Sequence, residues 1–245
     1  MLRDFRHFLT AAAMAAVLVA FAPGCDDDDS GKDKVRRDDN TIVVLTPADM
    51  SPYSYYDEDA KEFKGIEIDF VRAAAIKLGQ KVEVRRCPFD ELLGRVKSGE
   101  ADVAASVITI TDARKEDIDF SDPYETGGAS FLYRVGDPMP TMIRAETLRV
   151  AAVESMTHDF YLSVHGIDPI RFEVYQDAVA ALKEGRVDTV FFDDGVVRHT
   201  AETSGGKLAA SRRETREHFA LAIRKGMPEL MAAINAAIAE RKPAK

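Results

Sequence analysis

The hydrophobic residues of this chain follow two patterns, short apolar or alternating runs and longer runs with helical spacing. The first pattern is typical of strands and the second of amphipathic helices. In the first half of the chain these patterns predict five elements: a strand at Thr41–Thr46, a helix at Ile66–Leu78 before Gly79, a strand at Lys81–Arg86, a helix over 89–99 and a strand over 102–106. Strands that alternate with helices in this order form a mainly parallel sheet covered by helices, so the predicted fold class is α/β.

The second half of the chain repeats this order of elements. Strands are predicted over 148–153, 171–174 and 189–192, and helices from Thr157 onward and over 177–184. The segment VKSGEADVAAS, which begins at Val96, aligns without gaps with LKEGRVDTVFF, which begins at Leu182, and the alignment pairs Asp102 with Asp188. Two similar lobes are therefore predicted, although the same order of elements also arises by chance in α/β proteins.

The aligned segments also predict where a ligand binds. Ser106 and Val107 follow one strand at the position where Phe192 and Asp193 follow the other. In open α/β sheets, ligands bind outside the carboxyl ends of the strands. Two lobes that face each other would bring these ends together, and a cleft between lobes is a common ligand site.

Composition and charge narrow the class of protein. The chain has 245 residues, 46% of them hydrophobic, so it can bury a core in one large domain or two lobes. It has 33 Lys and Arg residues against 42 Asp and Glu, which gives a formal net charge of −9. Nucleic acid is excluded as an expected partner because phosphate backbones need a basic face.

The N-terminus has the pattern of an exported protein. Residues 1–7 carry Arg3 and Arg6, and an apolar run over 8–22 follows that is too short to span a membrane, so a signal peptide is predicted over residues 1–24. The run ends in Ala-Pro-Gly before Cys25, which resembles the lipobox of bacterial lipoproteins. That resemblance implies lipidation of Cys25. Ordinary cleavage and an uncleaved anchor are the alternatives.

The segment after Cys25 is polar. Residues 26–40, DDDDSGKDKVRRDDN, contain one apolar residue, so residues 25–40 are predicted to form the lipidated end and a disordered acidic tether. Cys87 is then the one thiol left in the exported domain, which predicts that the domain has no internal disulfide.

Several long stretches together resemble one protein family. They include FKGIEIDFVRAAAIKLGQKVEV, FDELLGRVKSGEADVAASVITITDARKEDIDFSDPY, EGRVDTVFFDDGVV and LAIRKGMPELMAAINAAIAE. The chain is similar over residues 41–240 to the bacterial extracellular solute-binding proteins of family 3, the amino-acid-type binding proteins of ABC importers. The resemblance implies a periplasmic-binding-protein fold (type II) with two lobes joined by two crossing strands. Its implied boundaries are 41–132 plus 218–245 for the first lobe and 133–217 for the second, with crossings at Ala129–Arg134 and 218–224.

The same resemblance implies a subsite for the carboxylate of an amino acid. Arg114 of TITDAR matches the family arginine that binds this group, and a guanidinium offers a planar pair of donors to two carboxylate oxygens. Thr109 and the backbone at Ser106 and Val107 are expected to complete the subsite. The alternative for Arg114 is a surface ion pair with a neighbouring carboxylate, Glu116 or Asp117.

Contacts from the second lobe are implied in the same way. Asp193 matches the family aspartate that accepts the ligand's ammonium group, with a helix N-cap as its alternative role. Asp194 is then the expected cap. Thr157 matches a family hydroxyl beside the carboxylate, and Ser155 departs from the family pattern at a position that we still include in the site.

The sequence indicates fewer contacts for the ligand's side chain than for its carboxylate and ammonium groups. Phe89 falls where the family has an apolar residue against the ligand, although a role in the helix core fits it equally well. Met50 and Tyr53 are further expected walls, although an exposed turn position or packing in the core fits Tyr53 equally well. Pro47 stands where many members have a carboxylate, which argues against a ligand with a cationic side chain.

These observations predict a lipid-anchored binding protein on the periplasmic side of the cell envelope that captures a free, polar amino acid for an ABC permease. We expect a monomer, no cofactor, no metal and no catalytic residue, because the four downstream histidines are scattered and no phosphate-binding or GxSxG motif is present. Two alternatives use the same fold. One is a periplasmic dehydratase resembling cyclohexadienyl dehydratase, with Glu154 as the candidate acid or base, and the other is a sensor for a signalling partner.

Overall fold

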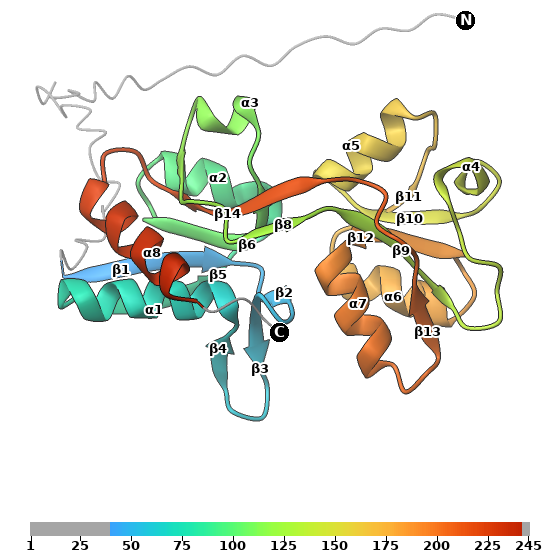
Figure 1. The fold of residues 1–245 in the computed structure, drawn as a ribbon, viewed down its shortest axis with the longest axis horizontal. Helices are drawn as coiled ribbons and strands as arrows, with labels where there is room; N and C mark the ends of the chain where they lie inside the picture. Colours follow the sequence, from blue (N-terminus) through green and yellow to red (C-terminus); the bar gives the residue numbers. More distant parts are fainter. Residues whose placement is uncertain (1–39, 242–245) are drawn as a thin grey trace, which may run out of the picture. The chain divides into compact units, whose positions relative to one another are not determined.

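The computed structural model of the chain describes residues 40–241. The predicted signal peptide, Cys25 and residues 26–39 of the predicted tether lie outside the described residues, as do residues 242–245. The described part contains two large sheets and one small sheet (Figure 1). Among the described residues, no helix has the length and apolar character needed to cross a membrane.

The first large sheet contains strands from both ends of the described chain. They are β1 (Thr41–Thr46), β5 (Lys81–Arg86), β6 (Val103–Thr109), β7 (Asp119–Phe120), β8 (Glu125–Gly127) and β14 (Glu217–Ile223). The order is β5, β1, β6, β14, β7, with β8 also paired to β14. β1 is parallel to β5 and β6, whereas β14 is antiparallel to its neighbours. The helices of this lobe are α1 (Ile66–Leu78), α2 (Phe89–Lys97), α3 (Asp112–Lys115) and α8 (Pro228–Glu240), and its small sheet is β2 (Asp49–Met50), β3 (Ser54–Asp57) and β4 (Glu62–Lys64).

The second large sheet is formed by the middle of the chain. Its strands are β9 (Ala129–Arg134), β10 (Val150–Val153), β11 (Ile170–Phe172), β12 (Thr189–Asp193) and β13 (Leu208–Ala210), in the order β11, β10, β12, β9, β13. β10 is parallel to β11 and β12, and β9 is antiparallel to β12 and β13. The helices of this lobe are α4 (Met142–Ala145), α5 (Thr157–Val164), α6 (Tyr175–Lys183) and α7 (Asp194–Thr203).

Local sequence explains the helix α1, which covers one face of the first sheet. Its apolar residues Phe70, Val71 and Ala74 recur at helical spacing and pack in one buried cluster with β1, β6 and β14. Gly65 precedes the helix with φ +121°, and a Cβ atom there would lie 2.2 Å from the carbonyl oxygen of Tyr53, so a side chain cannot be accommodated. Gly79 ends the helix in the left-handed conformation.

Two connections join the large sheets, and the first of them lies before residue 129, earlier in the chain than the predicted lobe boundary after residue 132. β8 ends at Gly127 in the first sheet and β9 begins at Ala129 in the second, and the chain returns between β13 and β14. All of β9 pairs within the second sheet, so residues 129–132, which the sequence assigned to the first lobe, pair with the second. The reason is that β9 is hydrogen-bonded to β12 and β13 along its whole length rather than crossing freely.

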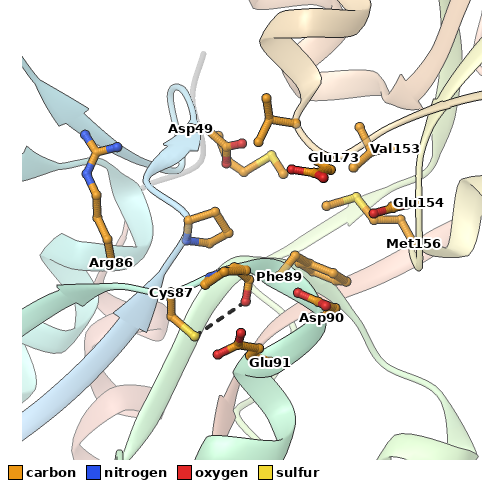
Figure 2. A pocket seen from close by; sticks show the side chains of 14 residues that line it. Asp49, Arg86, Cys87, Phe89, Asp90, Glu91, Val153, Glu154, Met156 and Glu173 are labelled. Atoms are coloured by element: carbon orange, nitrogen blue, oxygen red, sulfur yellow. Dashed lines mark hydrogen bonds between the residues drawn. The ribbon is translucent and has the colours of Figure 1, made fainter.

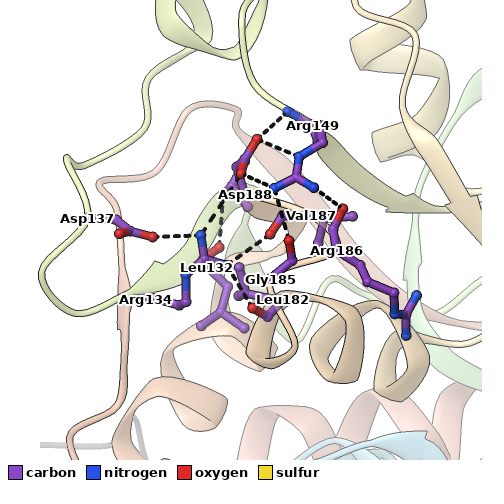
Figure 3. A network of polar contacts seen from close by, with 10 residues as sticks. Leu132, Arg134, Asp137, Arg149, Leu182, Gly185, Arg186, Val187 and Asp188 are labelled. Atoms are coloured by element: carbon purple, nitrogen blue, oxygen red, sulfur yellow. Dashed lines mark hydrogen bonds and ion pairs between the residues drawn. The ribbon is translucent and has the colours of Figure 1, made fainter.

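The two aligned aspartates have the same structural role in both lobes. Asp102 accepts a hydrogen bond from the backbone N–H of Val43 at 2.9 Å, and Asp188 accepts one from the backbone N–H of Arg149 at 2.8 Å. Each aspartate thus joins the start of its own strand to the neighbouring parallel strand. Figure 3 shows that Asp188 also receives the Arg149 side chain, with 2.7 Å between Nη2 and Oδ1. The repeat predicted from sequence therefore extends to hydrogen bonding.

Candidate functional site

The ends of β6 and β12 meet at a small pocket, which we call the inner pocket. It is lined by Phe89, Ser106, Val107, Thr109, Arg114, Met156, Thr157, His158 and Asp193. Seven of these nine residues are ones that the sequence places in the site. Its free volume is about 10 Å³, because the side chains that line it also contact one another. The inner pocket contains groups of both charges, which is suited to a zwitterion.

Arg114 reaches the inner pocket from α3. Thr111 caps this short helix by accepting a hydrogen bond from the Arg114 backbone N–H, and the Arg114 Nη1 donates to the carbonyl oxygen of Thr109 at 2.8 Å. The guanidinium carbon lies 5.9 Å from the centre of the Phe89 ring. Burial lowers the pKa of Arg114, and the group stays charged. Within residues 40–241, Arg114 forms no ion pair with Glu116 or Asp117, and Asp117 pairs with Lys97 instead.

Asp193 faces Arg114 from the other lobe, at the junction of β12 and α7. It is 2% exposed, and its Oδ1 lies 3.1 Å from Nε2 of His158. Burial raises the pKa of Asp193, and the nearby His158 opposes that rise. For His158, burial opposes protonation, but the carboxylates of Asp193 and Glu217 together outweigh it and raise the pKa of the imidazole. The acceptor predicted for a ligand ammonium therefore has a histidine partner.

The cap assignments at α7 differ from expectation. Asp193 occupies the N-cap position but its side chain makes no capping hydrogen bond. Asp194, the expected cap, is the first residue of the helix, and its Oδ2 receives Arg198 Nε and Arg213 Nη2, each at 3.0 Å. Asp194 is thus held by two arginines, and Asp193 is left facing the inner pocket.

The hydroxyl groups of the inner pocket are used in two ways. Thr109 Oγ1 donates to Oε2 of Glu217 at 2.6 Å, and Thr157 Oγ1 donates to the same oxygen at 3.2 Å. Ser106 is 1% exposed, and within residues 40–241 its hydroxyl has no hydrogen-bond partner. A buried polar group without a partner is costly, so the Ser106 hydroxyl is available to a bound molecule.

A second and larger space, the outer cavity, adjoins the inner pocket. Its volume is about 510 Å³, and Phe89 and Met156 line both spaces. Figure 2 shows carboxylates around it on several elements. The lining consists of Pro47, Asp49, Met50, Arg86, Cys87, Pro88, Phe89, Asp90, Glu91, Val153, Glu154, Met156, Glu173 and Val174. Five lining residues are acidic and one is basic.

Some charged residues of the outer cavity are paired with other residues of the protein, and others are not. Arg86 lies 3.7 Å from Glu58 and against the Tyr56 ring, so it is partly neutralised. Burial raises the pKa of Asp49 to about 6, with Arg86 opposing the rise. Within residues 40–241, neither Glu154 nor Glu173 forms an ion pair. The outer cavity therefore has an acidic character.

Three predicted contacts differ from their expected roles, although Val107 still lines the inner pocket. Ser155 is exposed in a turn with φ +63° and lines neither space. The backbone N–H of Val107 donates to Glu67 Oε1 at 3.1 Å, so this amide is engaged and we no longer expect it to hold a carboxylate. Tyr53 is buried and its hydroxyl donates to Glu125 Oε2 at 2.9 Å. The same hydroxyl packs against Gly195, where a Cβ atom would clash with it, so Tyr53 packs near α7 and lines neither space.

Sequence reasoning missed His158 and Glu217. His158 follows directly after Thr157 at the start of α5, so its position beside a predicted contact was the available signal. Glu217 lies 108 residues after Thr109, and no local pattern connects the two. The part of the chain that the structure describes contains no group of three or more His, Cys, Asp or Glu residues placed to hold a metal ion.

Comparisons with known proteins show which family and which structures the chain is similar to. Residues 42–244 match the family of bacterial extracellular solute-binding proteins, family 3. The chain is 28% identical over 244 residues to the L-cystine-binding protein TcyJ of Escherichia coli (strain K12), covering 96% of this chain and 91% of that protein. It also resembles holo ArgBP from T. maritima (TM-score 0.75, 28% identity, 83% of this chain and 92% of that chain).

An ancestral arginine-binding protein bound to glutamine is similar as well, with a TM-score of 0.74, 31% identity, and coverage of 82% of this chain and 91% of that chain. The predicted two-lobed periplasmic-binding-protein fold is thereby confirmed. The relatives named here are binding proteins rather than enzymes.

Proposed function

Because the chain belongs to family 3 of the bacterial extracellular solute-binding proteins, we propose that it captures a free amino acid between its lobes for an ABC importer. The observation that carries this proposal is the inner pocket, where Arg114 from one lobe and Asp193 from the other line the same space. A carboxylate and an ammonium group joined by one carbon atom need a cation and an anion a short distance apart. The inner pocket supplies both.

Within this proposal, the inner pocket holds the part that all amino acids share. Arg114 binds the carboxylate through its guanidinium, and the Ser106 hydroxyl adds a further hydrogen bond. Asp193 accepts a hydrogen bond from the ligand's ammonium group, and His158 holds the side-chain carboxylate of Asp193 in place. Since the two charged contacts come from different lobes, a ligand binds the closed form more tightly than an open form and so stabilises closure.

The outer cavity is proposed to hold the ligand's side chain, and its acidic lining favours a cationic one. This reverses the expectation based on Pro47, because Asp49, Glu154 and Glu173 supply carboxylates from other positions. A volume of about 510 Å³ also leaves room for a long side chain. The relatives include proteins described as binding arginine, glutamine and L-cystine, all polar amino acids.

Lipid attachment at Cys25 and delivery to an ABC permease complete the proposal. Cys25 lies outside the described residues, so its support is the sequence before it. Replacing Cys25 with Ser should release the protein from the membrane fraction, as measured by immunoblotting of fractionated cells. Continued membrane association of the Cys25→Ser variant would contradict a lipid anchor.

A thermal-shift screen over the free amino acids tests the proposed function. A ligand at about 100 times its dissociation constant adds roughly 2.7 kcal/mol, which raises the melting temperature of a protein of this size by about 5 to 10 °C. We expect the largest shifts with L-arginine and L-lysine. The chain has no Trp, so an external dye is the suitable readout. The absence of a shift with every amino acid would contradict the proposal.

A further inference from the structure

One carboxylate lies behind two of the threonines that line the inner pocket, and it was not among the predicted ligand contacts. Glu217 is the first residue of β14 and pairs with Gly127 at the end of β8. These two positions stand where the two connections between the lobes leave the first sheet. Glu217 is therefore part of the first sheet, at the point where that sheet meets the connecting segments.

The carboxylate of Glu217 receives three threonine hydroxyls. Thr109 Oγ1 and Thr157 Oγ1 donate to Oε2 at 2.6 and 3.2 Å, and Thr215 Oγ1 donates to Oε1 at 2.9 Å. A threonine hydroxyl has one hydrogen to donate. A hydroxyl that donates to Glu217 cannot donate to a second carboxylate at the same time.

Two of these threonines belong to different lobes. Thr109 ends β6 in the first lobe, and Thr157 begins α5 in the second. The Thr109 and Thr157 hydroxyl oxygens lie 3.5 Å apart, and the charge of Arg114 is close enough to interact with Glu217. The same hydroxyls and the same arginine form the proposed subsite for a ligand carboxylate, and the Glu217 carboxylate is hydrogen-bonded to both hydroxyls.

We propose that Glu217 is an internal occupant of the carboxylate subsite, which joins the two lobes through Thr109 and Thr157 and competes with the carboxylate of an incoming amino acid. The claim that Glu217 competes with a ligand carboxylate rests on the proposed function. The claim that Glu217 links the two lobes does not. The negative charge of Glu217 lowers the affinity for every ligand that carries a carboxylate. It also gives the closed arrangement a hydrogen-bonded link of its own.

The first test compares the wild type with Glu217→Gln by isothermal titration calorimetry. The neutral amide repels a ligand carboxylate less, so the variant should bind L-arginine about tenfold more tightly, the size of one charge-assisted hydrogen bond. L-Argininamide has no carboxylate, and its affinity should change less than twofold. Glu202→Gln, an exposed position on α7, removes the same charge and should leave both affinities unchanged.

Unchanged or weaker L-arginine binding by a folded Glu217→Gln variant would overturn the competition, because Glu217 would then be neutral or helpful to the ligand. Equal gains with L-arginine and L-argininamide would overturn it too, since the effect would not concern the carboxylate. Failure of the wild type to bind any amino acid would count against the proposed function. The distance measurement described next needs no ligand, so it tests the link between the lobes in that case too.

The second test measures the distance between the lobes without any added amino acid. Spin labels on Ile76→Cys in α1 and Ile143→Cys in α4 report it, because these side chains are 82% and 85% exposed. Glu217→Ala should shift the distance distribution toward longer distances, and Glu202→Ala should not. A distribution identical to that of the wild type would show that Glu217 does not join the lobes.

Discussion

The inner pocket and the outer cavity share Phe89 and Met156 as walls, yet their charges are arranged differently. In the inner pocket each charged side chain already has a polar partner in the protein, such as Thr109 for Arg114 and His158 for Asp193. In the outer cavity, carboxylates outnumber cations and surround about 510 Å³ of space.

This difference separates two tasks of recognition. Partners that hold Arg114 and Asp193 in place reduce the cost of ordering these groups when a ligand binds, so the inner pocket suits the group that all amino acids share. In the outer cavity Glu91 is held by Arg95, whereas Glu154 and Glu173 form no ion pair within residues 40–241 and can attract a cation without one fixed geometry. The outer cavity is therefore expected to decide which amino acid binds.

Removal of the inner cation should have the largest effect. Arg114→Ala is expected to weaken binding of L-arginine by thirty-fold or more, about 2 to 5 kcal/mol, because the ligand carboxylate is left buried without a counter-charge. Calorimetry measures the change. Arg144→Ala, at an exposed position of α4, is the matched control. Equal binding by the Arg114→Ala and wild-type proteins would exclude the inner pocket as the carboxylate subsite.

The neighbouring aspartates allow the second prediction. Asp193→Asn should weaken binding of L-arginine and L-glutamine alike, by about tenfold or more, since the ammonium group of either ligand loses its acceptor. Asp194→Asn should instead lower the melting temperature, because Arg198 and Arg213 lose a shared partner. If both variants altered binding equally, the separate roles of the two residues would be refuted.

A double substitution in the outer cavity should have a smaller and selective effect. Glu154→Gln with Glu173→Gln is expected to weaken L-arginine binding about three- to tenfold, since each partly exposed charge contributes about 0.5 kcal/mol or somewhat more. Binding of L-glutamine should change less than twofold. Equal losses for the two ligands would remove the outer cavity from the choice of side chain.

The smallest expected effect concerns pH. Burial raises the pKa of Asp49 to about 6, so its carboxyl is mostly neutral at pH 5 and mostly ionised at pH 7. A cationic side chain prefers the ionised form, and L-arginine binding should therefore strengthen about threefold across this interval. L-Glutamine binding should not follow, and Asp49→Asn should abolish the dependence. If the Asp49→Asn variant kept the pH dependence of the wild type, a group other than Asp49 would be responsible for that dependence.

The sequence alone located the main helices and strands of both lobes and named seven of the nine residues that line the inner pocket. Apolar spacing located the helix Ile66–Leu78 and the strand Lys81–Arg86 at the bounds that the structure has. The alignment paired Asp102 with Asp188, and the structure shows that each accepts a hydrogen bond from the backbone of the neighbouring parallel strand. Both succeed because periodicity and strand-edge hydrogen bonds depend on residues that are close in sequence or that recur in a fixed pattern.

Only the tertiary structure decided how the groups of the site are shared. Glu217 reaches Thr109 across 108 positions because β14 returns to the first sheet, and His158 reaches Asp193 because α5 packs near the end of β12. The carboxylates of the outer cavity likewise come from separate elements, so Pro47 alone did not indicate how many of them line it. The types of residue were visible in the sequence, but their partners depend on packing between distant segments, which no local pattern encodes.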